Sequence, residues 1–150
     1  MDVAAAADLI GRYRKNFSGV DVFLQECIEQ ARSKGYVSTI SGRRRLIPEI
    51  DARQPNIRQL GERLAINSVV QGSAADLIKK AMVDLLRQIR TERLPLKMLL
   101  QIHDELVLEA PESDAQAMGK IVVDAMERAM NLTVPLKAEC GIASDWMSTK

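Results

Sequence analysis

Length, composition and charge predict a globular chain with one ordinary core. The chain has 150 residues, of which 47% are hydrophobic and 27% charged, and its formal net charge is +1. This length supports one compact unit, residues 1–150, and not two comfortable cores. A net charge near zero excludes attraction of an anionic partner by the molecule as a whole, so an anion-binding surface needs local clustering of basic residues.

The cysteines and the N-terminal sequence indicate where the protein resides. Cys27 and Cys140 lie far apart in apolar patterns without paired-cysteine spacing. This predicts two reduced thiols in the core, and neither a disulfide nor a zinc site. The start, MDVAAAADLIGRYR, has no basic region ahead of its short apolar run, which is typical of neither a signal peptide nor a membrane span. We expect a cytoplasmic protein.

The first third of the chain predicts two helices and a hairpin. Alanine-rich residues 2–15 predict a helix that ends at the break NFSG. Apolar residues at helical spacing predict an amphipathic helix over residues 19–35, closed by a glycine. The segment YVSTISGRRRLIPEI has strand-like flanks around Ser41 and Gly42, which predicts a hairpin. Its tip is expected to carry Arg43, Arg44 and Arg45.

The remaining chain alternates helical and strand-like patterns. A long helical region follows Pro55 and ends at Pro95, and Gly72 with Ser73 predicts a kink or a junction of two helices inside it. Two short strands, a helix over residues 111–130 and a half-buried strand in PLKAECGI follow. The first two strands are too close for a parallel crossover. The predicted class is α+β, with a small antiparallel sheet packed against several helices.

The stretch LLQIHDELVLE places the only histidine of the chain and two adjacent carboxylates inside a strand-like run. One continuous strand would put Asp104 on the apolar face, where desolvation penalises a carboxylate. A three-residue turn of His103, Asp104 and Glu105 avoids this and exposes the acids at the tip of a hairpin. The apolar residues then face each other in two pairs, Ile102 with Leu106 and Leu100 with Leu108.

The paired acids of this turn allow two interpretations. Two carboxylates about 4 Å apart repel by roughly 4 kcal/mol at an effective dielectric near 20, unless a cation offsets the charge. Magnesium is a natural candidate because it binds one or two carboxylates together with substrate phosphates. The alternative is a solvated acidic turn with an incidental histidine, and the pattern alone leaves both open.

A polar stripe lies upstream of the acidic turn. Arg63, Asn67 and Gln71 are spaced by four residues and therefore share one helix face. Long hydrogen-bond donors in a row reach the minor-groove edge of a duplex, where all base pairs present similar acceptors. Between Ser41 and Ala65 there are six arginines against three acidic residues, which favours a phosphate-facing strip. An ordinary solvated helix face is the alternative.

Four sequence motifs occur together in this chain, in a fixed order and at fixed separations. These are GYVSTISGRRRLIPEI, ERLAIN, QGSAADLIKKAM and QIHDELVLE. Taken jointly they resemble the C-terminal, palm-region part of bacterial family A DNA polymerases, the DNA polymerase I type, whose pattern GYVETLxGRRRxxPEI the first motif follows. The resemblance extends from about Tyr13 through Trp146, and the alanine-rich start has no strong counterpart. A single-subunit RNA polymerase is a less fitting relative.

The resemblance implies roles for the turn. Asp104 matches a ligand of the catalytic magnesium ions, Glu105 a supporting acidic residue, and His103 a residue near the primer terminus. The reaction would be template-directed addition of deoxynucleotides to a primer 3′ end by two-metal phosphoryl transfer.

The resemblance also implies contacts with primer-template DNA. Arg63, Asn67 and Gln71 match residues that contact both strands near the newest base pair, largely through the minor groove. Arg58 lies on a basic position of the same helix and is expected to contact the template backbone.

The departures from the family pattern bear on activity. The family's first motif, with the other metal-binding aspartate, and its fingers helix, which holds the incoming deoxynucleoside triphosphate, do not occur in this sequence. KNFSGV replaces the family's xxYPGV at a helix entrance. The Mg²⁺ site would therefore be only partly supplied, and we expect the isolated chain to be inactive and able to self-associate through uncovered surface. The alternative is a non-catalytic module that binds duplex DNA or a partner protein.

Overall fold

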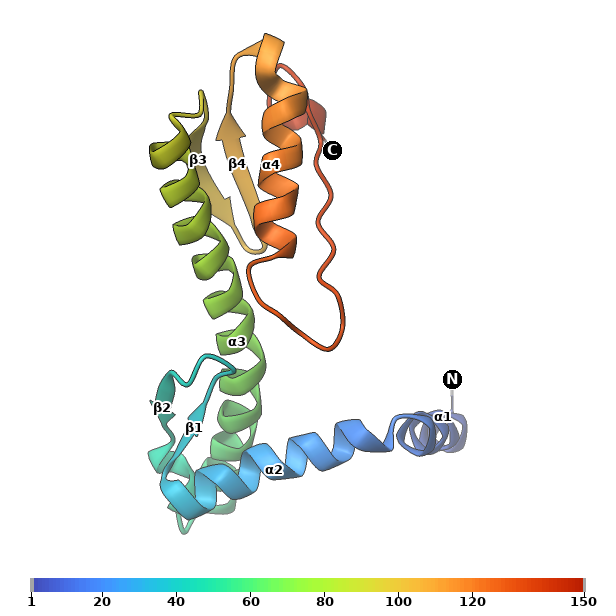
Figure 1. The fold of residues 1–150 in the computed structure, drawn as a ribbon. Helices are drawn as coiled ribbons and strands as arrows, with labels where there is room; N and C mark the ends of the chain where they lie inside the picture. The colour runs from blue at the N-terminus through green and yellow to red at the C-terminus, as the bar shows by residue number, and fades with distance from the viewer. Residues whose placement is uncertain (1, 150) are drawn as a thin grey trace. The chain divides into compact units, whose positions relative to one another are not determined.

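The computed structural model describes residues 2–149 and contains four α-helices and two two-stranded antiparallel sheets within that range (Figure 1). This mixture confirms the predicted α+β class. By its internal contacts the chain divides into two compact units, Met1–Ala74 and Ala75–Lys150. Each unit is described by itself below.

The first unit begins with two helices, as the sequence predicted. Helix α1 spans Val3–Asn16, and the carboxylate of Asp2 caps it by accepting a hydrogen bond of 2.7 Å from the Ala5 backbone N–H. Helix α2 spans Ser18–Lys34 after a break at Phe17. Gly35 ends α2 in the left-handed conformation, with φ of 73°, which glycine adopts without a side-chain penalty.

A hairpin follows α2, also as predicted. Strands β1 (Tyr36–Ser38) and β2 (Arg44–Leu46) pair antiparallel, and Gly42 in the turn has φ of 80°. The prediction that all three arginines lie at the tip was wrong. Arg44 and Arg45 are strand residues of β2 because the turn closes before them, and alternation along the strand therefore separates their side chains.

The core of the first unit lies between α2, the hairpin, the short helix η1 (Pro48–Asp51) and the first part of helix α3 (Pro55–Glu92). Its buried apolar side chains come from four elements and the loops between them. They are Ile28, Ala31, Val37, Ile47, Ile50 and Ala65.

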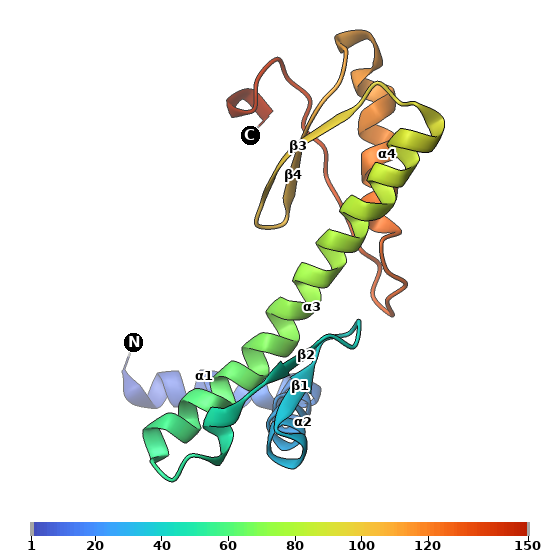
Figure 2. The same ribbon diagram turned by 90° about the vertical axis from the view of Figure 1, so that its left-hand side faces the viewer.

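Helix α3 is a single helix of 38 residues, so the kink or junction predicted at Gly72 and Ser73 was wrong (Figures 1 and 2). The glycine serves a close approach instead. A Cβ atom at Gly72 would lie 2.7 Å from Thr39 Cγ2 of the hairpin, so the small residue makes room for the hairpin on the helix surface.

The second unit contains the last part of α3, strands β3 (Lys97–Ile102) and β4 (Glu105–Glu109), the short helix η2 (Glu112–Asp114), helix α4 (Ala115–Glu127) and the short helix η3 (Met147–Thr149). Helix α4 confirms the helix predicted after Pro111. The buried cluster joins α3, the loop before β3 and α4, and consists of Leu85, Leu96, Met118 and Val122.

The segment PLKAECGI, residues 135–142, forms no strand, contrary to its alternating pattern. A strand needs a neighbouring backbone to pair with, and within residues 2–149 none pairs with this segment. It runs beside α4 instead, with the Ala138 N–H donating to the Glu127 carboxylate at 3.2 Å. Cys140 in it is exposed, so the prediction that both cysteines are core residues held only for Cys27.

No helix within residues 2–149 is long and apolar enough to cross a membrane.

Candidate nucleic-acid interface and acidic turn

The predicted acidic hairpin is present, but its turn has two residues and not three. Ile102 of β3 pairs with Glu105 of β4, so only His103 and Asp104 lie in the turn. His103 takes φ of 53°, which a tight two-residue turn allows and which histidine adopts more readily than branched residues. Glu105 is therefore the first residue of β4, next to the turn.

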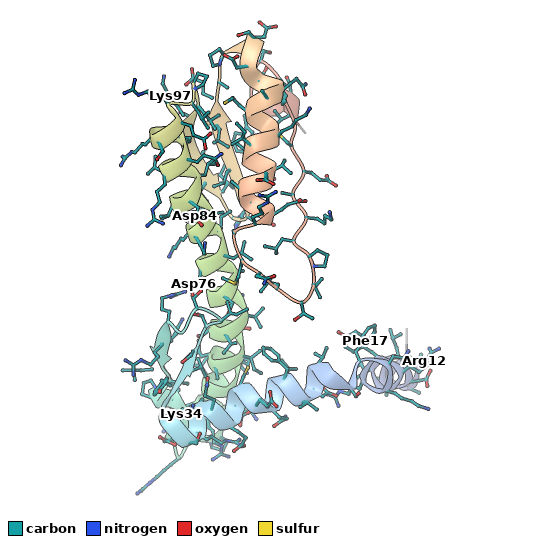
Figure 3. The ribbon with its side chains drawn as sticks, viewed as in Figure 1. Arg12, Phe17, Lys34, Asp76, Asp84 and Lys97 are labelled. Carbon is teal, nitrogen blue, oxygen red and sulfur yellow. The ribbon has the colours of Figure 1, made fainter. Side chains whose placement is uncertain are left out.

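The predicted pairing of the hairpin's apolar residues was also wrong. Leu106 pairs with Gln101, and a bulge between Met98 and Leu100 then brings Met98 opposite Leu108. The extra residue of a bulge reverses which face the following side chains occupy. Met98 and Leu108 consequently pack on the core of the second unit, whereas Leu100 is exposed. Lys97, at the start of β3, lies 3.7 Å from the Glu109 carboxylate (Figure 3).

The tip of the hairpin presents its polar side chains to solvent. His103, Asp104 and Glu105 are all exposed, and the Gln101 side-chain amide donates to the His103 carbonyl at 3.0 Å, which braces the turn. Carboxylate oxygens are the ligands that Mg²⁺ prefers. However, residues 2–149 contain no cluster of three or more histidine, cysteine, aspartate or glutamate side chains that would hold a metal ion. The donor type fits magnesium, and the donor set supplied here is partial.

The polar stripe lies on α3 in the first unit, as predicted. Arg58, Arg63, Asn67 and Gln71 are all exposed on this helix. Asn67 and Gln71 line a pocket of about 280 Å³ between α3 and the β1–β2 hairpin, and neither Arg58 nor Arg63 lines it. The stripe belongs to the first unit and the acidic turn to the second.

The pocket joins two features that the sequence predicted separately. Its lining combines arginines of the hairpin with the carboxamides of the stripe, over the apolar side chains of Val37 and Leu64. No acidic residue lines it. The remaining lining residues are Thr39, Arg43, Arg45, Ser68 and Gly72. The sequence predicted a local excess of arginines in this region. It did not indicate which of these arginines line a pocket together with residues of the stripe.

The chain belongs to DNA polymerase family A, because residues 1–148 match the sequence model of that family. The match includes the alanine-rich start, for which the motifs gave no counterpart.

Similar proteins include DNA polymerase I of Bacillus caldotenax, 45% identical over 145 residues, and the thermostable DNA polymerase I of Thermus aquaticus, 46% identical over 145 residues. Each alignment covers 97% of this chain, which spans only 16% of the first relative and 17% of the second. Among solved structures, the POL domain of Pol1 from M. smegmatis, in complex with DNA primer-template and dNTP, superposes with a TM-score of 0.86 at 39% identity. That superposition covers 91% of this chain and 24% of the other.

Proposed function

We propose that this chain is the C-terminal, palm-region share of a DNA-directed DNA polymerase, which adds deoxynucleotides to a primer 3′ end. One observation carries the proposal. A chain of DNA polymerase family A places adjacent carboxylates, Asp104 and Glu105, exposed at the tip of a braced hairpin. A non-catalytic binding module gains nothing from two repelling carboxylates at one turn.

Asp104 would hold magnesium, with Glu105 as a supporting acidic residue. Magnesium, when bound, would neutralise the charge that develops on the attacking and leaving oxygens of phosphoryl transfer. The chain's own contribution is geometric: pairing of Ile102 with Glu105 fixes the direction of the turn, and His103 beside it would lie near the primer terminus. Because the donor set is partial, the remaining ligands and the contacts with the deoxynucleoside triphosphate would come from other polymerase segments, and the isolated chain would be inactive.

Primer-template DNA is the proposed partner. The exposed donors Arg63, Asn67 and Gln71 on one face of α3 suit the minor-groove acceptors, which are nearly equivalent in all base pairs. Arg58, also exposed, would contact the template backbone. The similar Pol1 domain with its bound primer-template and dNTP supports this assignment. Replication or repair in the cytoplasm would be the setting.

Primer extension by the chain, mixed with a polypeptide that supplies the remaining polymerase segments, tests the function. Asp104→Asn should lower complemented extension about a hundredfold or more, because one group that stabilises transition-state charge is lost. Duplex binding should be unchanged. Glu112→Gln, which removes another exposed carboxylate of the same unit, is the matched control and should retain extension.

Two results would contradict the proposal. One is extension that stays absent with wild-type chain although both parts are folded. The other is complemented extension that survives Asp104→Asn unchanged. Duplex binding without any complemented extension would favour the alternative of a non-catalytic module.

A further inference from the structure

The pocket between α3 and the β1–β2 hairpin has the composition of an anion site. In a chain with 21 basic and 20 acidic residues, its lining contains two arginines and two carboxamides and no acid. Guanidinium and carboxamide N–H groups are donors that phosphate oxygens accept. Its volume of about 280 Å³ and its position entirely within the first unit make it a self-contained feature of this chain.

Arg45 is the cation available in this pocket. It is exposed, and within residues 2–149 no ion pair or side-chain hydrogen bond engages its guanidinium. Its neighbour Arg44 lies instead over the ring of Tyr36, with the guanidinium carbon 5.4 Å from the ring centroid, and does not line the pocket. Successive residues of a strand point to opposite faces, so β2 presents one arginine to the pocket and the other away from it.

Contacts around Gly72 fix the distance between the hairpin and the helix. The Ile40 backbone N–H donates to Ser73 Oγ at 2.9 Å, and the Arg43 guanidinium donates to the Gly72 carbonyl at 3.1 Å. A Cβ atom at Gly72 would lie 2.7 Å from Thr39 Cγ2, closer than atoms in contact approach, so the Thr39 side chain or the hairpin that carries it would have to shift. Gly72 and Ser73 are therefore placed to set the width of the pocket.

We propose that this pocket binds one backbone phosphate of duplex DNA through Arg45, beside the minor-groove contacts of Asn67 and Gln71, with Gly72 and Ser73 as positioning residues. The proposal rests on the proposed function, in which the α3 stripe faces primer-template DNA. It adds that the β1–β2 hairpin contacts the sugar-phosphate backbone of one DNA strand. A phosphate contact is independent of sequence, as a polymerase requires.

The salt dependence of duplex binding tests the proposal. The wild-type chain and the variants Arg45→Gln and Arg44→Gln are titrated with a short fluorescein-labelled duplex at several salt concentrations. Loss of one phosphate contact reduces the slope of log K against log salt by about 0.9. We expect this reduction for Arg45→Gln and an unchanged slope for Arg44→Gln, the matched control on the other face of β2. Equal reductions, or no reduction for Arg45→Gln, would overturn the proposal.

A separate measurement tests whether Ser73 positions the hairpin that carries Arg45. Ser73→Ala removes the hydroxyl that accepts from Ile40 without adding bulk, and it should weaken duplex binding at low salt without a further loss when combined with Arg45→Gln. Additive losses in the double variant would show that Ser73 does not act through Arg45. Circular dichroism of each variant verifies the fold.

A second binding experiment distinguishes a site for free phosphates from a site for the DNA backbone. The wild-type chain should bind inorganic pyrophosphate more weakly than the duplex, because the rest of the duplex adds contacts that a free phosphate lacks. Binding of pyrophosphate as tight as that of the duplex, lost in Arg45→Gln, would assign the pocket to free phosphates and overturn the proposal. Binding is measured here without extension, so failure of this inference leaves the Asp104→Asn result standing, and the reverse also holds.

Discussion

At the residue scale, the two cysteines occupy opposite environments. Cys27 is 5% exposed in α2, and burial, together with the charge of Glu26, raises the pKa of its thiol. Cys140 is exposed in the segment beside α4. Only the thiolate is a good nucleophile, so burial and a raised pKa both suppress reaction at Cys27.

We predict that a thiol reagent labels one cysteine quickly and the other slowly. At neutral pH, Cys140 should react about tenfold faster or more than Cys27, and both should react quickly in denaturant. Absorbance of the released thiolate from a disulfide reagent measures the two phases. Cys140→Ser is the control and should remove the fast phase alone; loss of the slow phase would contradict the assignment.

At the scale of elements, α3 meets η1 at Gly61. This glycine is buried, and a Cβ atom on it would lie 2.7 Å from the Ile50 backbone nitrogen and 2.8 Å from the Glu49 carbonyl carbon. Backbone atoms cannot turn aside as a flexible side chain does, so relief requires the helix and η1 to separate. The same contact positions the start of α3, which carries Arg58 and Arg63.

We predict that Gly61→Ala lowers the free energy of unfolding by about 1–3 kcal/mol, the usual range for overpacking. Gly11→Ala in α1 is the matched control, since a Cβ there meets nothing within 4 Å. It should raise the free energy of unfolding by about 0.5–1 kcal/mol through helix propensity. Urea denaturation measures both variants, and equal effects of the same sign would contradict the packing argument.

At the scale of the whole molecule, most buried apolar residues within residues 2–149 fall into two clusters with separate memberships. One cluster includes Ile47 and belongs to the first unit, and the other includes Leu85 and belongs to the second. Both residues are 0% exposed. A cavity made in one cluster removes contacts from its own members and from the partly buried side chains packed against them.

We predict that core truncations act locally. Leu85→Ala should reduce the stability of the second unit by about 2–5 kcal/mol and accelerate hydrogen exchange of β4 amides, with little change in β1. Ile47→Ala is the matched variant and should show the reverse pattern. Mass-spectrometric hydrogen exchange measures both, and equal acceleration throughout the chain would show that the two units unfold as one.

The sequence by itself determined the elements that local rules control. The helix ends at Phe17 and Gly35, the β1–β2 hairpin at Ser41–Gly42 and the acidic hairpin all follow from capping, turn chemistry and periodicity within a few residues. The motif combination also indicated DNA polymerase family A, which the match over residues 1–148 confirms. The assigned roles of Asp104, Glu105 and the α3 stripe stay predictions.

Only the tertiary structure decided what depends on distant partners. The bulge near Leu99 determines which hairpin residues reach the core, because packing as well as the alternating sequence pattern determines the register of the strands. Residues 135–142 alternate like a strand yet form none, since a strand exists only with a paired neighbour. The pocket that Arg45, Asn67 and Gln71 line together depends on contacts around Gly72 that join segments about thirty residues apart, which no local pattern encodes.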